Sequence, residues 1–299
     1  MGNLCESSEY DVNTVNQRTV TIIQLCLYVA AEAYFIYLTA SNFINNRVSK
    51  SDPYSVLVFV FAHCTLITTI LYLIGGMACI KLLLYYFLDQ TPILFYNFGV
   101  FALLLKLVDV LKKVDFTPVY SSFTISVLVM AVLHLICYIG FFTAKYVLNK
   151  NNVPMYHYLF FAELILFLMF TFFSWYLYGK YKEKFPSFKD INRTWFACNI
   201  IINVLLGMRL AFSINNMANG VEKLKASKSV WFSIYLLAVG LLTEVTPFLT
   251  LTQFMQLLSQ KTFDRLVNES TESQLVLGSN MKDSVASDEE AHQNSGKAQ

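Results

Sequence analysis

The chain has 299 residues, of which 56% are hydrophobic and 14% charged, with 26 Phe and 18 Tyr and a net charge of +2. This composition is too apolar for one water-soluble core and too poor in Gly and Pro for a fibrous protein. Both classes are therefore excluded, and the lipid bilayer is indicated as the solvent of most of the chain.

Long apolar stretches recur along the sequence, and each is long enough for the roughly 20 residues of a membrane-spanning helix. Seven are predicted, at about Val20–Ala40, Tyr54–Phe87, Thr91–Leu111, Val119–Phe142, Met155–Gly179, Thr194–Ile214 and Val230–Gln256. None alternates as outer-membrane strands do. The sequence thus predicts an all-α membrane protein, a seven-transmembrane helix bundle over residues 19–258. A polar leader (1–18) and a disordered tail (259–299) flank it.

The second stretch is longer than one crossing and contains Gly75 and Gly76. If it were two spans, the second half from Met77 to Leu88 would be too short and would include Lys81. We therefore expect one long helix that bends at the glycines or leaves the membrane near Lys81, with an eight-span count as the alternative.

Lys and Arg near the span ends predict the orientation, because they resist translocation. With the N-terminus outside or luminal, eleven lie on the cytosolic side: Arg47, Lys50, Lys112, Lys113, Lys180, Lys182, Lys184, Lys189, Arg193, Lys261 and Arg265. Seven lie on the other side: Arg18, Lys81, Lys145, Lys150, Lys223, Lys225 and Lys228. The opposite orientation would suit acylation of Gly2 and Cys5 in the leader, although Glu6 stands where the myristoylation motif has Ser or Thr.

Charged residues inside the predicted spans are candidate functional groups, because a charge at bilayer depth is costly unless it is paired or hydrated. They are Glu32, Lys106, Asp109, Glu163, Arg209 and Glu244. Lys106 and Asp109 are three residues apart on one helix and can neutralise one another. Arg209 and Glu244 are expected at different depths, beyond the reach of an Arg side chain.

Glu244 and Pro247 form the candidate intramembrane polar site, together with Asp109, Arg209 and Glu32. A proline in the middle of a span leaves a backbone carbonyl without its hydrogen bond, about one turn earlier. A kink beside an acid creates a polar pocket or a hinge, and a protonated glutamate beside a tolerated membrane proline is the alternative.

Enzyme motifs are absent from the sequence, which has no H-E-x-x-H, no G-x-S-x-G and no paired intramembrane aspartates. His63 and His134 are expected to be hydrogen-bonded bundle residues. The chain also lacks rhodopsin-like receptor signatures, since Val108-Asp109-Val110 replaces Asp-Arg-Tyr. No enzymatic activity, metal or cofactor is therefore expected.

A family resemblance is carried by Thr91-Pro92-Ile93-Leu94-Phe95, Asp109, Tyr178-Gly179-Lys180, Phe185-Pro186, Arg209, Tyr235-Leu236-Leu237 and Glu244-x-x-Pro247. In this order the residues resemble the tobamovirus multiplication protein family, with its THH/TOM-type domain, over about Thr91 to Gln256. The resemblance implies a seven-span, receptor-like endomembrane protein of vacuoles or lysosomes. It also implies a small Arf-like GTPase as the partner.

The predicted function is a non-enzymatic membrane scaffold whose cytosolic connectors recruit a partner. Lys182, Lys184, Lys189 and Arg193 are the candidate docking residues, and the Lys112-Lys113 turn adds to them. Such residues attract an acidic-faced protein or anionic lipid head groups, although they also serve as topology signals. A ligand receptor, or a small transporter using Glu32, Asp109 and Glu244, is the alternative.

The predicted tail contains an acidic cluster, Ser287-Asp288-Glu289-Glu290. Its serine suits a kinase that recognises acidic residues, and phosphorylation would add further negative charge.

Overall fold

In a computed structural model of the chain, residues 15–45, 47–78, 80–115, 119–148, 153–184, 189–219, 238 and 246–259 are described. Their elements are α1 (Val15–Ile44), α2 (Pro53–Met77), α3 (Leu82–Asp115), α4 (Val119–Phe142) with a π-helical continuation (Thr143–Val147), α5 (Met155–Lys184), α6 (Lys189–Asn219) and α9 (Thr246–Leu257). All of these elements are helical, which confirms the predicted helical class.

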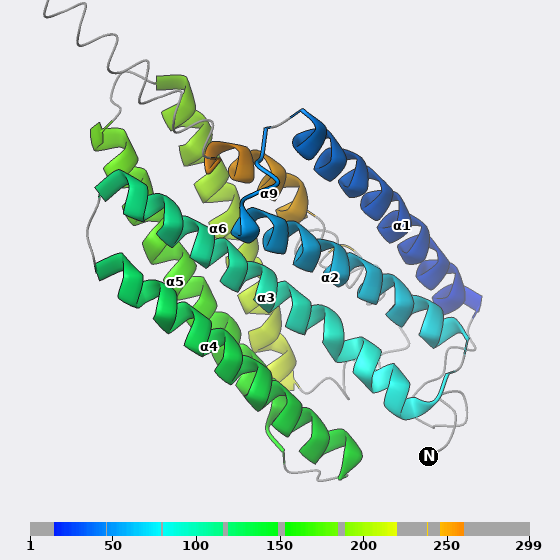
Figure 1. Cartoon of the computed structure of the whole chain (residues 1–299). Helices are drawn as coiled ribbons and strands as arrows, with labels where there is room; N and C mark the ends of the chain where they lie inside the picture. Colours follow the sequence, from blue (N-terminus) through cyan, green and yellow to red (C-terminus); the bar gives the residue numbers. More distant parts are fainter. Residues whose placement is uncertain are drawn as a thin grey trace, which may run out of the picture.

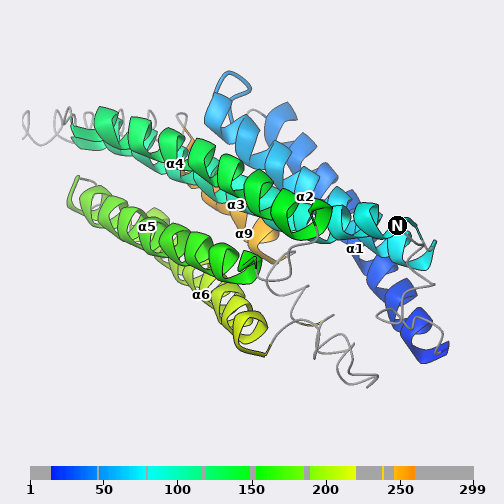
Figure 2. The same cartoon turned by 90° about the horizontal axis from the view of Figure 1, so that it is seen from below.

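The helices form two layers, which Figure 2 shows in a view from below. α1, α2, α3 and α4 lie side by side in one layer, and α5 and α6 form the other. α3 packs on α2, α4 and α5, while α9 lies between the layers and packs on α6 and α1 (Figure 1). α3 is therefore the central helix of the bundle.

Among the described helices, six, α1 to α6, are long and apolar enough to cross a membrane. Their outward faces carry exposed apolar side chains, such as Ile125, Val132 and Ile136 on α4. Lipid solvates such a face, whereas water would not. The chain is thus built as an integral multi-pass membrane protein, as the composition predicts.

The prediction of one long second helix is wrong. α2 ends at Met77, and a new helix begins at Leu82 instead of Thr91. The chain reverses closely after Gly75, where an added Cβ would lie 2.6 Å from Cδ1 of Ile80. Glycine permits this approach because it has no side chain. Residues 82–88 therefore extend α3, form no eighth span, and leave Lys81 in the connector.

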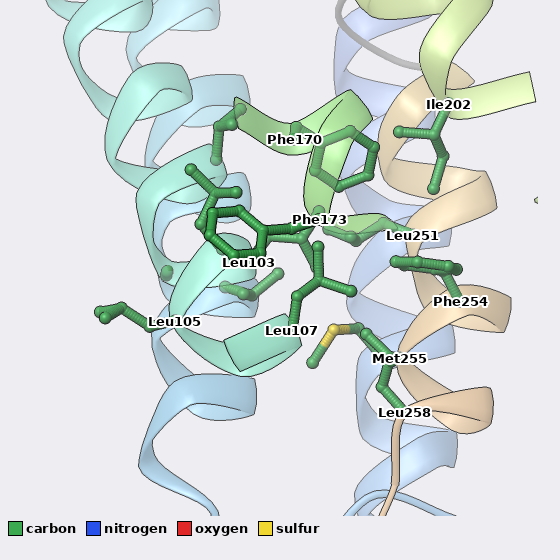
Figure 3. Packing of buried hydrophobic residues seen from close by; sticks show 14 of the residues in the cluster. Leu103, Leu105, Leu107, Phe170, Phe173, Ile202, Leu251, Phe254, Met255 and Leu258 are labelled. Atoms are coloured by element: carbon green, nitrogen blue, oxygen red, sulfur yellow. The ribbon is translucent and has the colours of Figure 1, made fainter. Parts of the chain in front are cut away.

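The seventh predicted span falls mostly outside the described residues. Its described part is residue 238 and the twelve-residue helix α9. In α9, Leu251, Phe254 and Met255 are buried, and so is Leu258 directly after it. Figure 3 shows them facing core side chains of α3 and α5 such as Leu107 and Phe170. α9 thereby fills the space between the layers, and the seven-span count stays a prediction.

Three contacts gather the connectors at one end of the bundle. Lys106 of α3 reaches Asp52 before α2, Lys184 of α5 reaches Val114 of α3, and Gln256 of α9 reaches Asn42 of α1. We call this the basic end. At the opposite end, the start of α3 meets the π-helical continuation of α4, where the rings of Tyr86 and Tyr146 stack with centroids 4.7 Å apart. The chain thus alternates between two ends, as a multi-pass protein must.

Candidate functional site

A surface rich in Lys and Arg covers the basic end. It comprises Arg47, Lys50, Lys112, Lys113, Lys182, Lys184 and Arg193, and we call these seven residues the basic surface. Of these, Arg47, Lys50, Lys182, Lys184 and Arg193 are exposed, and Lys112 and Lys113 are half-buried. They come from the connector before α2, the end of α3, the end of α5 and the start of α6. Segments far apart in sequence therefore contribute to one surface.

The link between two predicted basic segments is a hydrogen bond from Lys184. Its Nζ atom donates to the backbone oxygen of Val114 at 3.0 Å. The last carbonyls of a helix lack partners within the helix and carry partial negative charge, so a lysine is favourable there. The ends of α3 and α5 are thus joined, and the Lys112-Lys113 pair lies beside the predicted docking residues Lys182 and Lys184.

Beneath this surface, the buried Lys106 pairs with Asp52. Lys106 is 1% exposed, and its Nζ lies 2.5 Å from Oδ2 of Asp52. Burial alone would raise the pKa of Asp52. Hydrogen bonds from Lys106 and Ser55 outweigh that cost and hold the pKa below its ordinary value. Asp52 also accepts a bond from the backbone N–H of Ser55 at 3.4 Å, as an N-cap of α2.

Asp109, the predicted partner of Lys106, makes only a secondary contact with it, with Oδ2 of Asp109 3.9 Å from Nζ of Lys106. Asp109 instead accepts a hydrogen bond from Lys113 at 3.0 Å, four residues later on α3. Asp52 was not among the predicted site residues, although its position before Pro53 is typical of a helix N-cap. Asp109 therefore belongs to the basic end and not to a polar site inside the bundle.

Arg209 of α6 and Glu163 of α5 form a buried ion pair inside the bundle. Nε of Arg209 lies 3.3 Å from Oε1 of Glu163, and each residue is 7% exposed. The hydroxyl of Ser213 donates to Oε2 of Glu163. The guanidinium carbon lies 3.9 Å from the ring centroid of Tyr96 on α3. A carboxylate, a hydroxyl and an aromatic face therefore offset the cost of burying the Arg209 charge.

A small cavity adjoins this ion pair, between α3, α5 and α6. The space open to the centre of a water-sized sphere is about 10 Å³, which suits one water molecule. Asn97 lines the cavity, is fully buried, and has no hydrogen-bond partner for its Oδ1 atom among the described residues. The Nδ2 atom of the same amide lies 3.3 Å from Nε2 of His134. A water here would satisfy Asn97, whereas a larger ligand would need the helices to separate.

Further polar contacts run along the seam between α5 and α6. Thr171 donates to Asn203 at 2.6 Å, and Asn199 donates to the backbone oxygen of Ser174 at 3.1 Å. As residue numbers rise along α5 they fall along α6, which is the register of two antiparallel helices. Such bonds hold membrane helices together where no hydrophobic effect can.

Glu32 and His63 form a separate polar contact between α1 and α2. Nδ1 of His63 lies 2.8 Å from Oε1 of Glu32, and Nε2 lies 3.2 Å from Oγ1 of Thr39. On α4, Nδ1 of His134 lies 2.6 Å from the Tyr158 hydroxyl. The prediction that both histidines are hydrogen-bonded bundle residues is confirmed.

The predicted intramembrane site residues whose side chains are described do not gather in one place. Glu32, Asp109 and Arg209 each have a different partner. Glu244 lies outside the described residues, and Pro247 stands in the first turn of α9 as described. Within the described ranges, no group of three or more His, Cys, Asp or Glu could hold a metal ion.

A comparison of the chain with protein-family models, curated proteins and solved structures finds no match.

Proposed function

We propose that this protein is a non-enzymatic, multi-pass endomembrane scaffold that recruits an acidic cytosolic partner to its basic surface. The observation that carries this proposal is the joining of separate basic segments at one end of the bundle. The bond between Lys184 and Val114 brings the ends of α3 and α5 together. Topology alone requires Lys and Arg on one side, but it does not require them to be joined into one surface.

The charge of this end favours an acidic partner. Asp52 and Asp109 have Lys106 and Lys113 as their close partners, and Glu183 lies 3.8 Å from Lys180. Positive charge remains in excess over the rest of the basic surface. A concentrated positive field attracts an acidic protein face and accelerates encounter. The resemblance to the tobamovirus multiplication protein family favours a small Arf-like GTPase in this role, at a vacuolar or lysosomal membrane.

Neutralisation of basic residues tests the proposal. The variant Lys112→Gln, Lys182→Gln, Lys189→Gln should recruit less cytosolic partner to organelle membranes, and the loss should grow with salt. The matched control is Lys223→Gln, Lys225→Gln, Lys228→Gln, which removes the same charge from the predicted opposite side. If both variants are expressed equally and recruit equal amounts of partner, the basic residues serve only as topology signals and the proposal is rejected.

The buried ion pair favours a second candidate, an ion pathway or ligand receptor. Glu163, Arg209 and Asn97 surround the cavity, and charged groups inside a bundle frequently mark transport routes. Flux measured in liposomes separates the two candidates. Proton-coupled flux that is lost in Glu163→Gln would support transport, whereas its absence in the wild-type protein leaves the scaffold as the better account.

A further inference from the structure

The described part of the chain ends with Ser259, at the basic end. Nε2 of Gln256 donates to Oδ1 of Asn42 at 2.6 Å, which fixes the end of α9 against the end of α1. Asn42, Met255 and Leu258 are all buried, so this junction is well packed. Asn42 lies five residues before Arg47, the first member of the basic surface. The last 40 residues of the sequence therefore start beside the basic surface.

The charge of this following segment is opposite to that of the basic surface. Between residues 269 and 290 the acidic residues are Glu269, Glu272, Asp283, Asp288, Glu289 and Glu290, against the single cation Lys282. Three of the acids are consecutive, at 288–290. The distance is also suitable, because packed helices lie about 8–10 Å apart and an extended residue covers about 3.3 Å. The 28 residues between Ser259 and Asp288 far exceed the ten or so needed to cross the bundle end.

We propose that the acidic cluster Asp288-Glu289-Glu290 of the same chain binds the basic surface and occupies it until an acidic partner displaces it. This inference rests on the proposed function for its regulatory meaning. Phosphorylation of Ser287 would add nearly two negative charges beside the cluster and strengthen the contact. Attachment to the same chain keeps the effective concentration of this cluster high. The cluster therefore occupies the basic surface when acidic partner proteins are scarce.

Zero-length carbodiimide crosslinking of the purified full-length chain tests the contact directly. The protein is placed in nanodiscs of neutral phosphatidylcholine, and carboxylate–lysine crosslinks are mapped by mass spectrometry. We expect crosslinks from residues 288–290 to Lys112, Lys113 or Lys182. Their yield should fall severalfold between about 0.1 M and about 1 M salt, where the Debye length falls from about 10 Å to about 3 Å. The pair Asp109 and Lys113, 3.0 Å apart, is the internal control that should crosslink at both concentrations.

Two variants complete the test. Lys112→Glu, Lys182→Glu should lose the tail crosslinks severalfold, whereas Lys223→Glu, Lys225→Glu should keep them. Mixed light and heavy isotopic copies distinguish a contact within one chain from a contact between chains. Absent tail crosslinks, equal yields to lysines of both ends, or crosslinks only between copies would each overturn the proposal.

The recruitment assay separates this proposal from the proposed function. If both hold, Asp288→Asn, Glu289→Gln, Glu290→Gln should raise partner recruitment severalfold, because the basic surface is uncovered. If the intramolecular crosslinks form but partner recruitment does not depend on the basic surface, the tail contact holds and the scaffold function is rejected. If recruitment depends on the basic surface but no tail crosslinks form, the scaffold function holds and the tail contact is rejected.

Discussion

Glu163 and Arg209, 46 residues apart in sequence, form an ion pair buried between α5 and α6. Removal of one member leaves the other charged in a low-dielectric setting, which typically costs about 3–5 kcal/mol. We therefore expect Glu163→Gln and Arg209→Met each to lower the melting temperature of the detergent-solubilised protein clearly.

The double variant Glu163→Gln, Arg209→Met is the control for this ion pair. It contains no unpaired charge, so it should be more stable than Arg209→Met alone. Additive losses in the double variant would show that the two side chains act independently, contrary to the observed geometry.

The pair of Lys106 and Asp52 predicts an acid-sensitive contact at the basic end. Because the pKa of Asp52 is lowered in the folded protein, its contribution is present above its unfolded pKa of about 4 and is lost as pH falls through the lower folded value. Melting temperature should thus decrease below about pH 4 less steeply in Asp52→Asn than in the wild-type protein. Parallel curves for the two proteins would refute this role for Asp52.

Lys106→Met gives a second measure of the same contact. It leaves the half-buried Asp52 without its cation, and we expect a loss of about 1–3 kcal/mol at neutral pH. Combination with Asp52→Asn should recover part of that loss, and no recovery would indicate that packing of the lysine stem dominates.

The hydrogen bond between Asn42 and Gln256 predicts the position of α9. In a chain without its native cysteines, Asn42→Cys, Gln256→Cys should react with a short bifunctional thiol reagent and migrate as a crosslinked species after cleavage of the intervening chain. Asn42→Cys, Gln253→Cys is the matched control, because Gln253 is exposed on a different face of α9. Preferential crosslinking of the control would contradict the observed packing.

Glu244 is tested by Glu244→Gln. If Glu244 is charged and paired, the change should lower the melting temperature or abolish recruitment, since its partner would lack a counter-charge. If Glu244→Gln has the melting temperature and the partner recruitment of the wild-type protein, Glu244 has a packing role only.

Much of the fold follows from hydropathy, because each span must satisfy its own backbone hydrogen bonds in lipid. Helix ends are harder to predict where the apolar run continues through a connector. Leu82 to Leu88 are as apolar as α2, so composition gives no sign that they start α3. The close approach of Gly75 and Ile80 depends on a backbone reversal that only the tertiary structure contains.

The candidate site was predicted less completely than the fold, because the interaction partners of its charged residues come from different helices. Arg209 and Glu163 were both recognised as charged span residues, but their pairing was not. The signal was present, since a short connector near Phe185-Pro186 makes α5 and α6 antiparallel and sets residues equidistant from it opposite one another. The same argument finds Glu32 opposite His63 across the connector between α1 and α2. Lys106 and Asp52 are likewise nearly equidistant from the connector between α2 and α3, at residues 78–81. This pairing was not predicted because the chain was expected to reverse after Phe87 and not after Met77.

The most direct test of the central claim is the sidedness of the basic surface. Single cysteines at Lys50, Lys113 and Lys182 are placed in a cysteine-free chain and labelled with a membrane-impermeant maleimide, in cells whose plasma membrane alone is permeabilised. All three should label with organelles intact, whereas a cysteine at Lys81 should label only after detergent. A tag after Gln299 should likewise be accessible and one before Gly2 protected. Labelling at Lys81 with protection of the other three would place the basic surface in the lumen and contradict cytosolic recruitment.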